Sequence, residues 1–309
     1  MSMRLAVVAL SGGLLGMSAL VLSTAPAAHA APSAPATARL PDPTAGPGGQ
    51  GSRTPLVVAH RGASGYAPEN TLAAVDKADQ LGVDWVENDV QRTKDGELIV
   101  MHDATLDRTT DVEEVFPGRA PWKVSDFTSR EIARLDAGSS FSEAYAGERV
   151  PTLRQFLDRL ERNGQRLLLE LKVPAQYPGI EGQTLRALDR AGWLDGRAAS
   201  RLVIQSFDAS AVKTVHNLRP AVRTGYLGNP EAAELPGYAQ FVDQINPRHS
   251  AVTKEYVRQV QRVRGAHGNR LEVNTWTVDD DSTARQVLAA GVDGIISNKP
   301  DVALRAIRG

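Results

Sequence analysis

The chain has 309 residues, of which 42% are hydrophobic and 23% are charged, and this excludes collagen-like, low-complexity and intrinsically disordered chains. The 35 basic and 36 acidic residues give a net charge of −1, which argues against a nucleic-acid partner, since nucleic-acid binders usually carry a strong basic excess. Cysteine is absent, which excludes disulfides, zinc–thiolate sites and a catalytic thiol.

The N-terminus is predicted to be a signal peptide over residues 1–30. Arg4 supplies a positive charge, residues 5–22 are apolar and uncharged, and an A-x-A cleavage site ends at Ala30. An uncleaved membrane anchor is the alternative, but the apolar run is near the lower limit for crossing a bilayer. We therefore expect cleavage after Ala30, a secreted protein, and no stable membrane anchor after cleavage.

Residues 31–54 are rich in alanine, proline and glycine, which predicts a disordered leader. The folded domain is expected over residues 55–309. Its β-type runs are 56–61, 84–90, 166–172, 201–207, 223–228, 243–246, 271–278 and 293–297. Its amphipathic helical stretches are 69–81, 152–163, 180–192, 209–217, 253–266 and 281–290.

The alternation of these strands and helices predicts a parallel sheet in an α/β fold. Eight strand–helix units predict a (β/α)8 TIM barrel, for which about 250 residues is typical. A doubly wound open sheet is the alternative. No G-x-G-x-x-G turn follows the first strand, which weakens that alternative.

A hairpin interrupts the alternation after the second strand, because Asp95-Gly96 is a turn signal followed by an apolar run. A two-residue loop would set Asp89 opposite His102, and a four-residue loop would set Glu87 there. Either register puts these side chains on one face. A small insertion follows over about residues 104–150.

Aromatic residues are frequent in this insertion. They are Phe116, Trp122, Phe127, Phe141 and Tyr145. Such a cluster could be the core of a cap over the functional site, or it could be only the insertion's own packing.

Polar residues stand at the C-terminal ends of the apolar strands, where a barrel of this type has its active site. Three of them, Glu87, Asp89 and Glu170, would repel one another unless a cation lies among them. Carboxylate oxygens favour Ca²⁺ or Mg²⁺ over zinc. The alternative is that each carboxylate pairs with Arg61 or Lys172.

Two histidines, His60 and His102, stand at the ends of the first strand and of the hairpin. Imidazoles titrate near neutrality, so the pair could act as general base and general acid, or could be structural. Arg61 and Lys172 could bind an anion such as phosphate. Together these groups suit in-line displacement at phosphorus.

Blocks of sequence then resemble a known family. HRGASGYAPENTLAA (60–74) and VENDVQRTKDGELIVMHDATLDRTT (86–110) resemble the opening signature of the glycerophosphodiester phosphodiesterase family, in its secreted bacterial type. LELK, QSFD, VNTWTVDD and DGIISNKP are similar to its later blocks. The resemblance covers about residues 55–305. It implies a (β/α)8 barrel, one divalent cation, and hydrolysis of small-molecule glycerophosphodiesters to sn-glycerol 3-phosphate and an alcohol.

The resemblance also implies roles for single residues. The matched positions are His60 and His102 as the acid–base pair, Glu87, Asp89 and Glu170 as metal ligands, Arg61 and Lys172 as phosphate-binding residues, Trp276 beside the bound glycerol, and Glu69 and Asn70 as supporting residues. We expect Asn70 to be the N-cap of the first helix. Barrel-end packing is the alternative role of Trp276. SNKP at 297–300 departs from the family's T-D-x-P, and we expect it to alter only the last loop.

Two other functions stay open at this point. A secreted phospholipase D-like lyase on the same barrel would need an apolar lipid-docking surface. A non-catalytic binding barrel would have lost a histidine or a carboxylate, and all five are present. Among the cations, Ca²⁺ is favoured by the all-carboxylate ligand set and the expected export, with Mg²⁺ as the alternative.

Overall fold

The computed structural model describes residues 54–309, apart from the side chains of 197–199. The predicted signal peptide, 1–30, and all but the last residue of the predicted leader, 31–54, lie outside the described residues. Among the described residues, no helix combines the length and the apolar character needed to cross a membrane.

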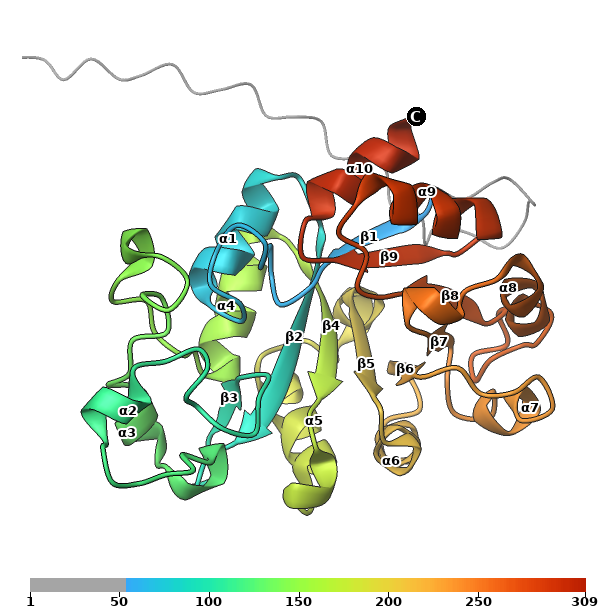
Figure 1. Cartoon of the computed structure of the whole chain (residues 1–309). Coiled ribbons are helices and arrows are strands. Elements are labelled where there is room, and N and C mark those ends of the chain that lie inside the picture. The colour runs from blue at the N-terminus through green and yellow to red at the C-terminus, as the bar shows by residue number, and fades with distance from the viewer. Residues whose placement is uncertain (1–53) are drawn as a thin grey trace, which may run out of the picture. The chain divides into compact units, whose positions relative to one another are not determined.

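Eight parallel strands of the described part close into a barrel, in which β1 pairs with both β2 and β9 (Figure 1). The barrel strands are β1 (Leu56–Ala59), β2 (Trp85–Arg92), β4 (Arg166–Leu171), β5 (Leu202–Ser206), β6 (Arg223–Leu227), β7 (Gln244–Asn246), β8 (Glu272–Thr275) and β9 (Gly294–Ser297). Each strand coincides with one of the eight predicted runs. The predicted (β/α)8 barrel is therefore confirmed, and the open sheet is wrong.

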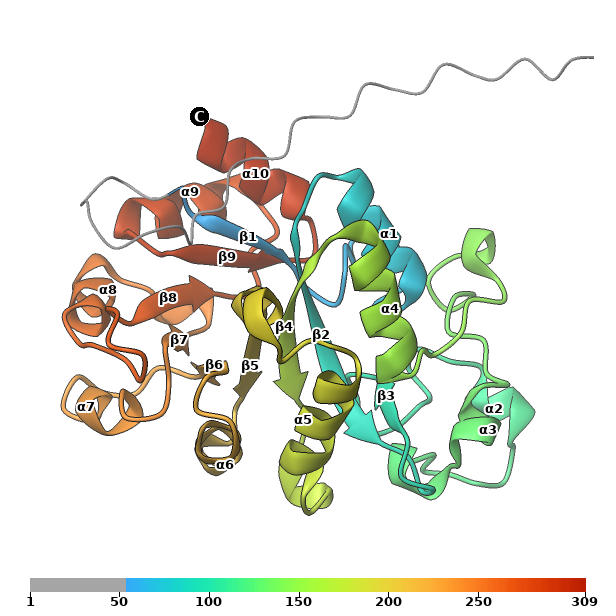
Figure 2. The same ribbon diagram turned by 180° about the vertical axis from the view of Figure 1, so that it is seen from behind.

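Helices surround the barrel on its outside, as the two opposite views show (Figures 1 and 2). The longer helices are α1 (Leu72–Gln80), α4 (Leu153–Asn163), α5 (Ile180–Arg190), α6 (Ala209–Leu218), α8 (Lys254–Gln261), α9 (Asp281–Ala290) and α10 (Pro300–Arg308). The short ones are α2 (Val112–Val115), α3 (Ser129–Ile132), α7 (Leu235–Tyr238), and the 3₁₀ turns η1 (Val124–Asp126), η2 (Glu143–Tyr145), η3 (Pro174–Gln176), η4 (Gly196–Arg201) and η5 (His249–Ala251). The first six of the longer helices coincide with the predicted helical stretches, whereas α10 was not predicted.

The strands are apolar on both faces because both faces are buried. Outward side chains pack under the helices in one large core, whereas inward side chains form a small separate core. The inward set is Val58, Trp85, Leu168, Val203 and Ile296. Because side chains alternate along a strand, the residues two and four positions further on also point inward, toward the carboxyl ends of the strands.

The hairpin between β2 and β3 (Leu98–Val100) has a register that neither predicted loop gives. Val90 pairs with Val100, so the loop holds the three residues 94–96. The two predicted registers are each wrong by one residue. A three-residue loop is allowed because Gly96 adopts a left-handed φ of 89°. His102 lies two residues beyond the end of β3, and its place in the site is set by the loop rather than by strand alternation.

The insertion over 104–150 forms a core of its own beside β3 (Figure 1). Phe127 is fully buried there, with Phe116 packed edge-on at 5.3 Å between ring centroids and Trp122 also against this core. Phe141 is 43% exposed, and the Tyr145 hydroxyl donates to the backbone carbonyl of Tyr66, between β1 and α1. The aromatic residues thus serve mainly the insertion's own packing, which was one of the two predicted alternatives.

Candidate active site

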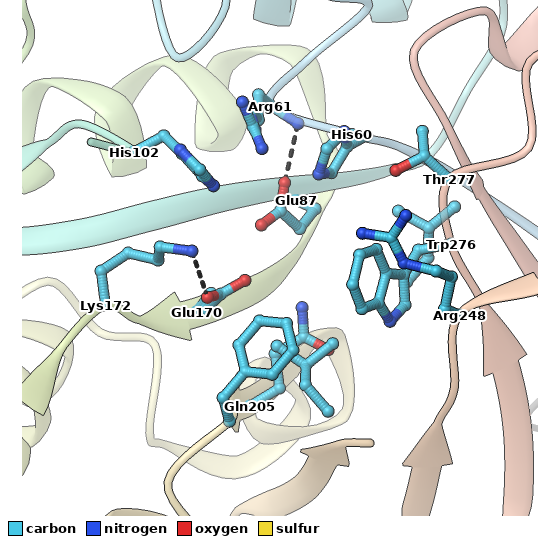
Figure 3. A pocket seen from close by; sticks show the side chains of 13 residues that line it. His60, Arg61, Glu87, His102, Glu170, Lys172, Gln205, Arg248, Trp276 and Thr277 are labelled. Atoms are coloured by element: carbon cyan, nitrogen blue, oxygen red, sulfur yellow. Dashed lines mark hydrogen bonds and ion pairs between the residues drawn. The ribbon is translucent and has the colours of Figure 1, made fainter. Parts of the chain in front are cut away.

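A cavity of about 410 Å³ opens at the carboxyl ends of the barrel strands (Figure 3). Its lining residues are His60, Arg61, Glu87, His102, Glu170, Lys172, Gln205, Phe207, Leu227, Arg248, Trp276, Thr277 and Ile296. Seven of these are candidates from the sequence. The other three candidates, Glu69, Asn70 and Asp89, do not line the cavity, but each contacts Arg61. No residue of the insertion 104–150, all of it described, lines the cavity.

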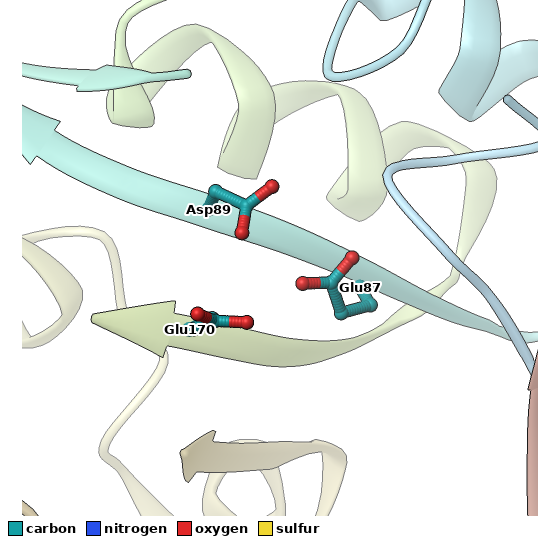
Figure 4. Close-up of side chains that lie close together, drawn as sticks. All are labelled: Glu87, Asp89 and Glu170. Carbon is teal, nitrogen blue, oxygen red and sulfur yellow. The ribbon is translucent and has the colours of Figure 1, made fainter. Parts of the chain in front are cut away.

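Glu87, Asp89 and Glu170 form a buried carboxylate triad, with one oxygen of each within 4.8 Å of the others (Figure 4). Their exposed fractions are 0%, 1% and 6%. Glu87 and Asp89 are two residues apart on β2 and so share its inner face. Glu170 joins them because it is the register partner of Asp89 on the neighbouring strand β4.

Burial and the closeness of the three carboxylates shift the pKa values of the triad. Burial, with the charges of Asp89 and Glu170, raises the pKa of Glu87 well above its usual range. Burial and the charge of Asp89 raise the pKa of Glu170 to about 7. Burial also opposes ionisation of Asp89, but Lys172 and Arg61 hold the pKa of Asp89 below its usual range. The protein's own cations therefore offset the repulsion only in part.

The donor set of the triad fits a hard divalent cation. Glu87 Oε1 and Asp89 Oδ1 are buried and accept no hydrogen bond from any described residue. Leaving a buried carboxylate oxygen unpaired is costly. A cation held by the three carboxylates would offset this cost, and Ca²⁺ and Mg²⁺ prefer carboxylate ligands. The triad could therefore hold one such ion.

Two cationic residues flank the triad. The Arg61 backbone N–H donates to Glu87 Oε2 at 2.7 Å, and the Arg61 guanidinium lies 3.0 Å from Glu69 and 3.5 Å from Asp89. Lys172 Nζ lies 2.7 Å from Glu170 Oε1 and 3.6 Å from Asp89 Oδ1. The predicted alternative, in which arginine and lysine pair with the carboxylates, is thus present, yet it leaves the two triad oxygens described above without a hydrogen bond.

Asn70 does not cap the first helix, so that prediction is wrong. Helix α1 begins one residue later than the prediction requires, and its N-cap is Thr71, whose hydroxyl accepts from Ala74 N at 3.3 Å. Asn70 instead adopts a left-handed φ of 61°, which asparagine tolerates better than most residues. Its Nδ2 donates to Asp89 Oδ2 at 2.8 Å, so it orients a triad carboxylate.

His60 is held by an amide. Its Nδ1 lies 2.7 Å from Asn298 Oδ1, and the Asn298 Nδ2 donates to Asp279 Oδ2 at 2.7 Å. An ionised carboxylate only accepts hydrogen bonds, so the amide oxygen of Asn298 must face His60. Nδ1 of His60 therefore carries the proton, and Nε2 is the unprotonated nitrogen of the neutral ring. Burial, together with the charge of Arg61, lowers the pKa of His60 to about 4.

Asn298 is the second residue of the SNKP segment. The expectation that this segment alters only the last loop is wrong, because its asparagine is the hydrogen-bond partner of His60.

His102 is held by a carboxylate. Its Nδ1 lies 2.6 Å from Asp103 Oδ1, and Asp103 is paired with Arg108. Burial opposes ionisation of Asp103, but the hydrogen bond from Arg108 prevails and lowers its pKa to about 2. Arg108 also lies 2.6 Å from Glu69, which contacts Arg61. Ion pairs of alternating charge thus connect Asp103, Arg108, Glu69 and Arg61, and the part of Arg108 was not predicted from the sequence.

Another part of the cavity wall is formed by Phe207, Trp276 and Arg248, and we call it the aromatic wall. The rings of Phe207 and Trp276 meet edge-on at 5.5 Å, and the guanidinium of Arg248 lies 5.0 Å from the Trp276 ring centroid. Trp276 Nε1 donates to Asn246 O at 2.9 Å. Trp276 therefore lines the cavity and packs the barrel end at once. Arg248 was not among the residues predicted from the sequence, because no local pattern marks it.

The barrel and this cavity define a (β/α)8-barrel enzyme, and comparison with known proteins assigns the family. The profile of the glycerophosphoryl diester phosphodiesterase family matches residues 60–302. The chain belongs to this family.

Relatives and solved structures agree with this assignment. A glycerophosphodiester phosphodiesterase of Caldanaerobacter subterraneus is 35% identical over 82% of this chain and 98% of its own. One from Bacillus subtilis is 36% identical over 80% of this chain and 84% of its own. A phosphodiesterase of Oleispira antarctica, solved in complex with the product sn-glycerol-3-phosphate, is 29% identical with a TM-score of 0.70, covering 83% of this chain and 98% of that one.

Proposed function

We propose that the protein hydrolyses glycerophosphodiesters to sn-glycerol 3-phosphate and an alcohol, with one divalent cation held by Glu87, Asp89 and Glu170. The observation that carries this proposal is the buried triad, two of whose oxygens accept no hydrogen bond from the described residues, in a cavity that also exposes two histidines to a ligand. The family membership and the product bound to the Oleispira antarctica relative support the same substrate class.

Arg61 and Lys172 bind the substrate phosphate in this proposal. Both line the cavity beside the triad. Burial opposes their charge, but the neighbouring carboxylates raise the pKa of each, so both stay cationic. When bound, the divalent cation supplies further positive charge against the negative charge that develops on the phosphate oxygens. Trp276 offers its ring to a glycerol carbon chain of the substrate.

The two histidines take different parts because their partners differ. His60 is neutral and its Nε2 lacks a proton, so it accepts the proton of the attacking hydroxyl, which comes from water or from the substrate's own glycerol. His102 Nδ1 lies 2.6 Å from a carboxylate oxygen of Asp103, so a charged group orients His102 where an amide orients His60. We assign His102 as the donor of a proton to the leaving alcohol.

Product analysis tests the proposed reaction. The purified protein is incubated with glycerophosphocholine in two reactions, one with Ca²⁺ and one with Mg²⁺. The products are then separated by chromatography. We expect sn-glycerol 3-phosphate and choline. Choline phosphate with glycerol would contradict the proposal, and a cyclic phosphate as the end product would favour the lyase alternative. Absence of any reaction would favour the binding barrel.

We also propose Ca²⁺ as the ion and export as the destination. The all-carboxylate ligand set supports Ca²⁺, and the pattern of residues 1–30 supports export. N-terminal sequencing of the protein recovered from culture medium tests export. A chain that begins at Ala31 is expected, and a chain that stays cell-bound with residue 1 intact would contradict it.

A further inference from the structure

Arg248 is held in place at the cavity wall by the backbone around it. It follows β7 and forms a parallel bridge with Trp276, and the N–H of His249 donates to Trp276 O at 2.8 Å. Figure 3 shows Arg248 and Trp276 on the side of the cavity opposite Lys172 and His102. A ligand that occupies the whole cavity therefore extends from the triad toward Arg248.

The charge of Arg248 is available to a ligand. The other two cations of the cavity are already paired, since Arg61 lies 3.0 Å from Glu69 and Lys172 lies 2.7 Å from Glu170. Arg248 makes no ion pair with any acidic side chain in the part of the chain that the structure describes. Its guanidinium instead lies over the ring of Trp276, 5.0 Å from the centroid.

The aromatic wall does not favour a quaternary ammonium group. Trp276 already contacts Arg248, and Lys172 Nζ lies 5.6 Å from the ring centroid of Phe207. Rings that bind choline need faces free of other cations. Here each ring lies beside a cation of the protein, which would repel a choline at the same place. The wall is therefore suited to a group of opposite charge.

We propose that Arg248, supported by Trp276, forms a subsite for a second anionic group of the substrate, with phosphate as the best match. The planar guanidinium presents paired N–H donors that fit phosphate oxygens. The protein then prefers glycerophosphodiesters that carry a second phosphate, such as glycerophosphoglycerol phosphorylated on its far hydroxyl, over those that end in choline. This inference rests on the proposed function and names its substrate class.

Three substrates that differ in charge beyond the scissile phosphate test the subsite. They are phosphorylated glycerophosphoglycerol, glycerophosphoglycerol and glycerophosphocholine, compared by kcat/KM. We expect the phosphorylated substrate to be preferred over glycerophosphoglycerol by about tenfold, the effect of one charge-assisted contact. Arg248→Gln is expected to remove most of this preference, mainly through KM, and Arg248→Lys to retain part of it.

Arg162→Gln is the matched control, because Arg162 is an exposed arginine at the end of α4, just before β4 begins. This control is expected to keep the wild-type preference. A wild-type enzyme that hydrolyses glycerophosphoglycerol without preferring the phosphorylated form would overturn the subsite and leave the proposed function standing. An Arg248→Gln variant that keeps the preference for the phosphorylated substrate would also overturn the subsite and leave the proposed function standing.

A binding measurement separates failure of the subsite from failure of the enzyme. Isothermal titration compares glycerol 1,3-bisphosphate with sn-glycerol 3-phosphate on the wild type and on Arg248→Gln. We expect tighter binding of the bisphosphate by the wild type and a loss of that difference in the variant. Equal affinities in the wild type would overturn the inference. Absence of hydrolysis of all three substrates would overturn the proposed function instead.

Discussion

Substituting Asp279 by asparagine should invert the tautomer of His60, although the two residues do not touch. Asp279 accepts from the backbone N–H of Asn298 at 2.8 Å and from its Nδ2 at 2.7 Å. In Asp279→Asn, the remaining side-chain oxygen still accepts from the backbone N–H of Asn298. The new NH₂ group then faces the side-chain amide of Asn298. We expect the amide of Asn298 to rotate and present its NH₂ to His60. Nδ1 of His60 then accepts, and the proton moves to Nε2.

The size of the effect follows from the bond that is reversed. In the protein, His60 Nδ1 donates to Asn298 Oδ1 over 2.7 Å in a partly buried setting. Holding the ring in the opposite tautomer forfeits about one buried hydrogen bond, which costs about 1–3 kcal/mol. If that cost falls on the proton-accepting step, kcat decreases about 5- to 150-fold.

Two readouts together check this reasoning. Nitrogen-15 chemical shifts of the imidazole report which nitrogen of His60 carries the proton, and kcat on glycerophosphocholine is measured in parallel. Ser64→Ala is the control, because Ser64 also donates to Asn298 Oδ1, and its loss leaves the bond to His60 in place. An inverted tautomer with an unchanged kcat would refute the role of His60 as base. An unchanged tautomer would refute the hydrogen-bond assignment.

Three further predictions concern turnover and stability. His102→Ala is expected to lower kcat about 10²- to 10⁴-fold with an unchanged thermal melt, and near-wild-type turnover would remove His102 from the mechanism. Asn88→Leu is expected to raise the free energy of unfolding in urea by about 1–3 kcal/mol, because both polar atoms of the fully buried Asn88 amide lack partners among the described residues, and a loss of stability would contradict this. Hydrogen bonds from Thr93 and Ser129 lower the pKa of Asp95 from 3.8 to about 2, below its unfolded value, so they stabilise the fold above about pH 4 and are lost as the pH falls toward 2. Asp95→Asn should therefore flatten the decrease in stability between these pH values, and a slope equal to that of the wild type would count against it.

The barrel could be predicted from the sequence because its strands are buried on both faces. Such strands form continuous apolar runs, and turns or helical patterns separate them. The triad could be predicted for a related reason. The carboxyl ends of parallel strands meet at one end of a barrel, so polar residues there come together even when β2 and β4 are far apart in the chain. The structure adds that Asp89 and Glu170 are register partners on these two strands.

Details that depend on one residue of register could not be predicted. The hairpin loop has three residues instead of two or four, a difference that the alternation of side chains does not encode. Helix α1 begins at Leu72, so Thr71 is its N-cap, and the Asn70 side chain donates a hydrogen bond to Asp89 instead. Both positions offer good capping side chains, so propensity alone does not choose between them.

Hydrogen bonds and ion pairs between residues far apart in the sequence could not be predicted either. Asn298 lies 238 positions from His60, and no local pattern connects them. Arg108 lies 39 positions from Glu69, in a loop with no regular period. Helix α10 was missed because small alanines, Ala303 and Ala306, form much of its buried face and give a weak apolar signal.

Metal dependence of product release tests the central claim most directly. The protein is stripped with a chelator, then assayed for sn-glycerol 3-phosphate release from glycerophosphocholine with Ca²⁺ or Mg²⁺ added back. We predict no release in the chelator, recovery with Ca²⁺, and a higher Ca²⁺ requirement for Glu170→Gln, which loses one anionic ligand of the triad. Full release in the presence of the chelator, or an unchanged Ca²⁺ titration for Glu170→Gln, would contradict the account.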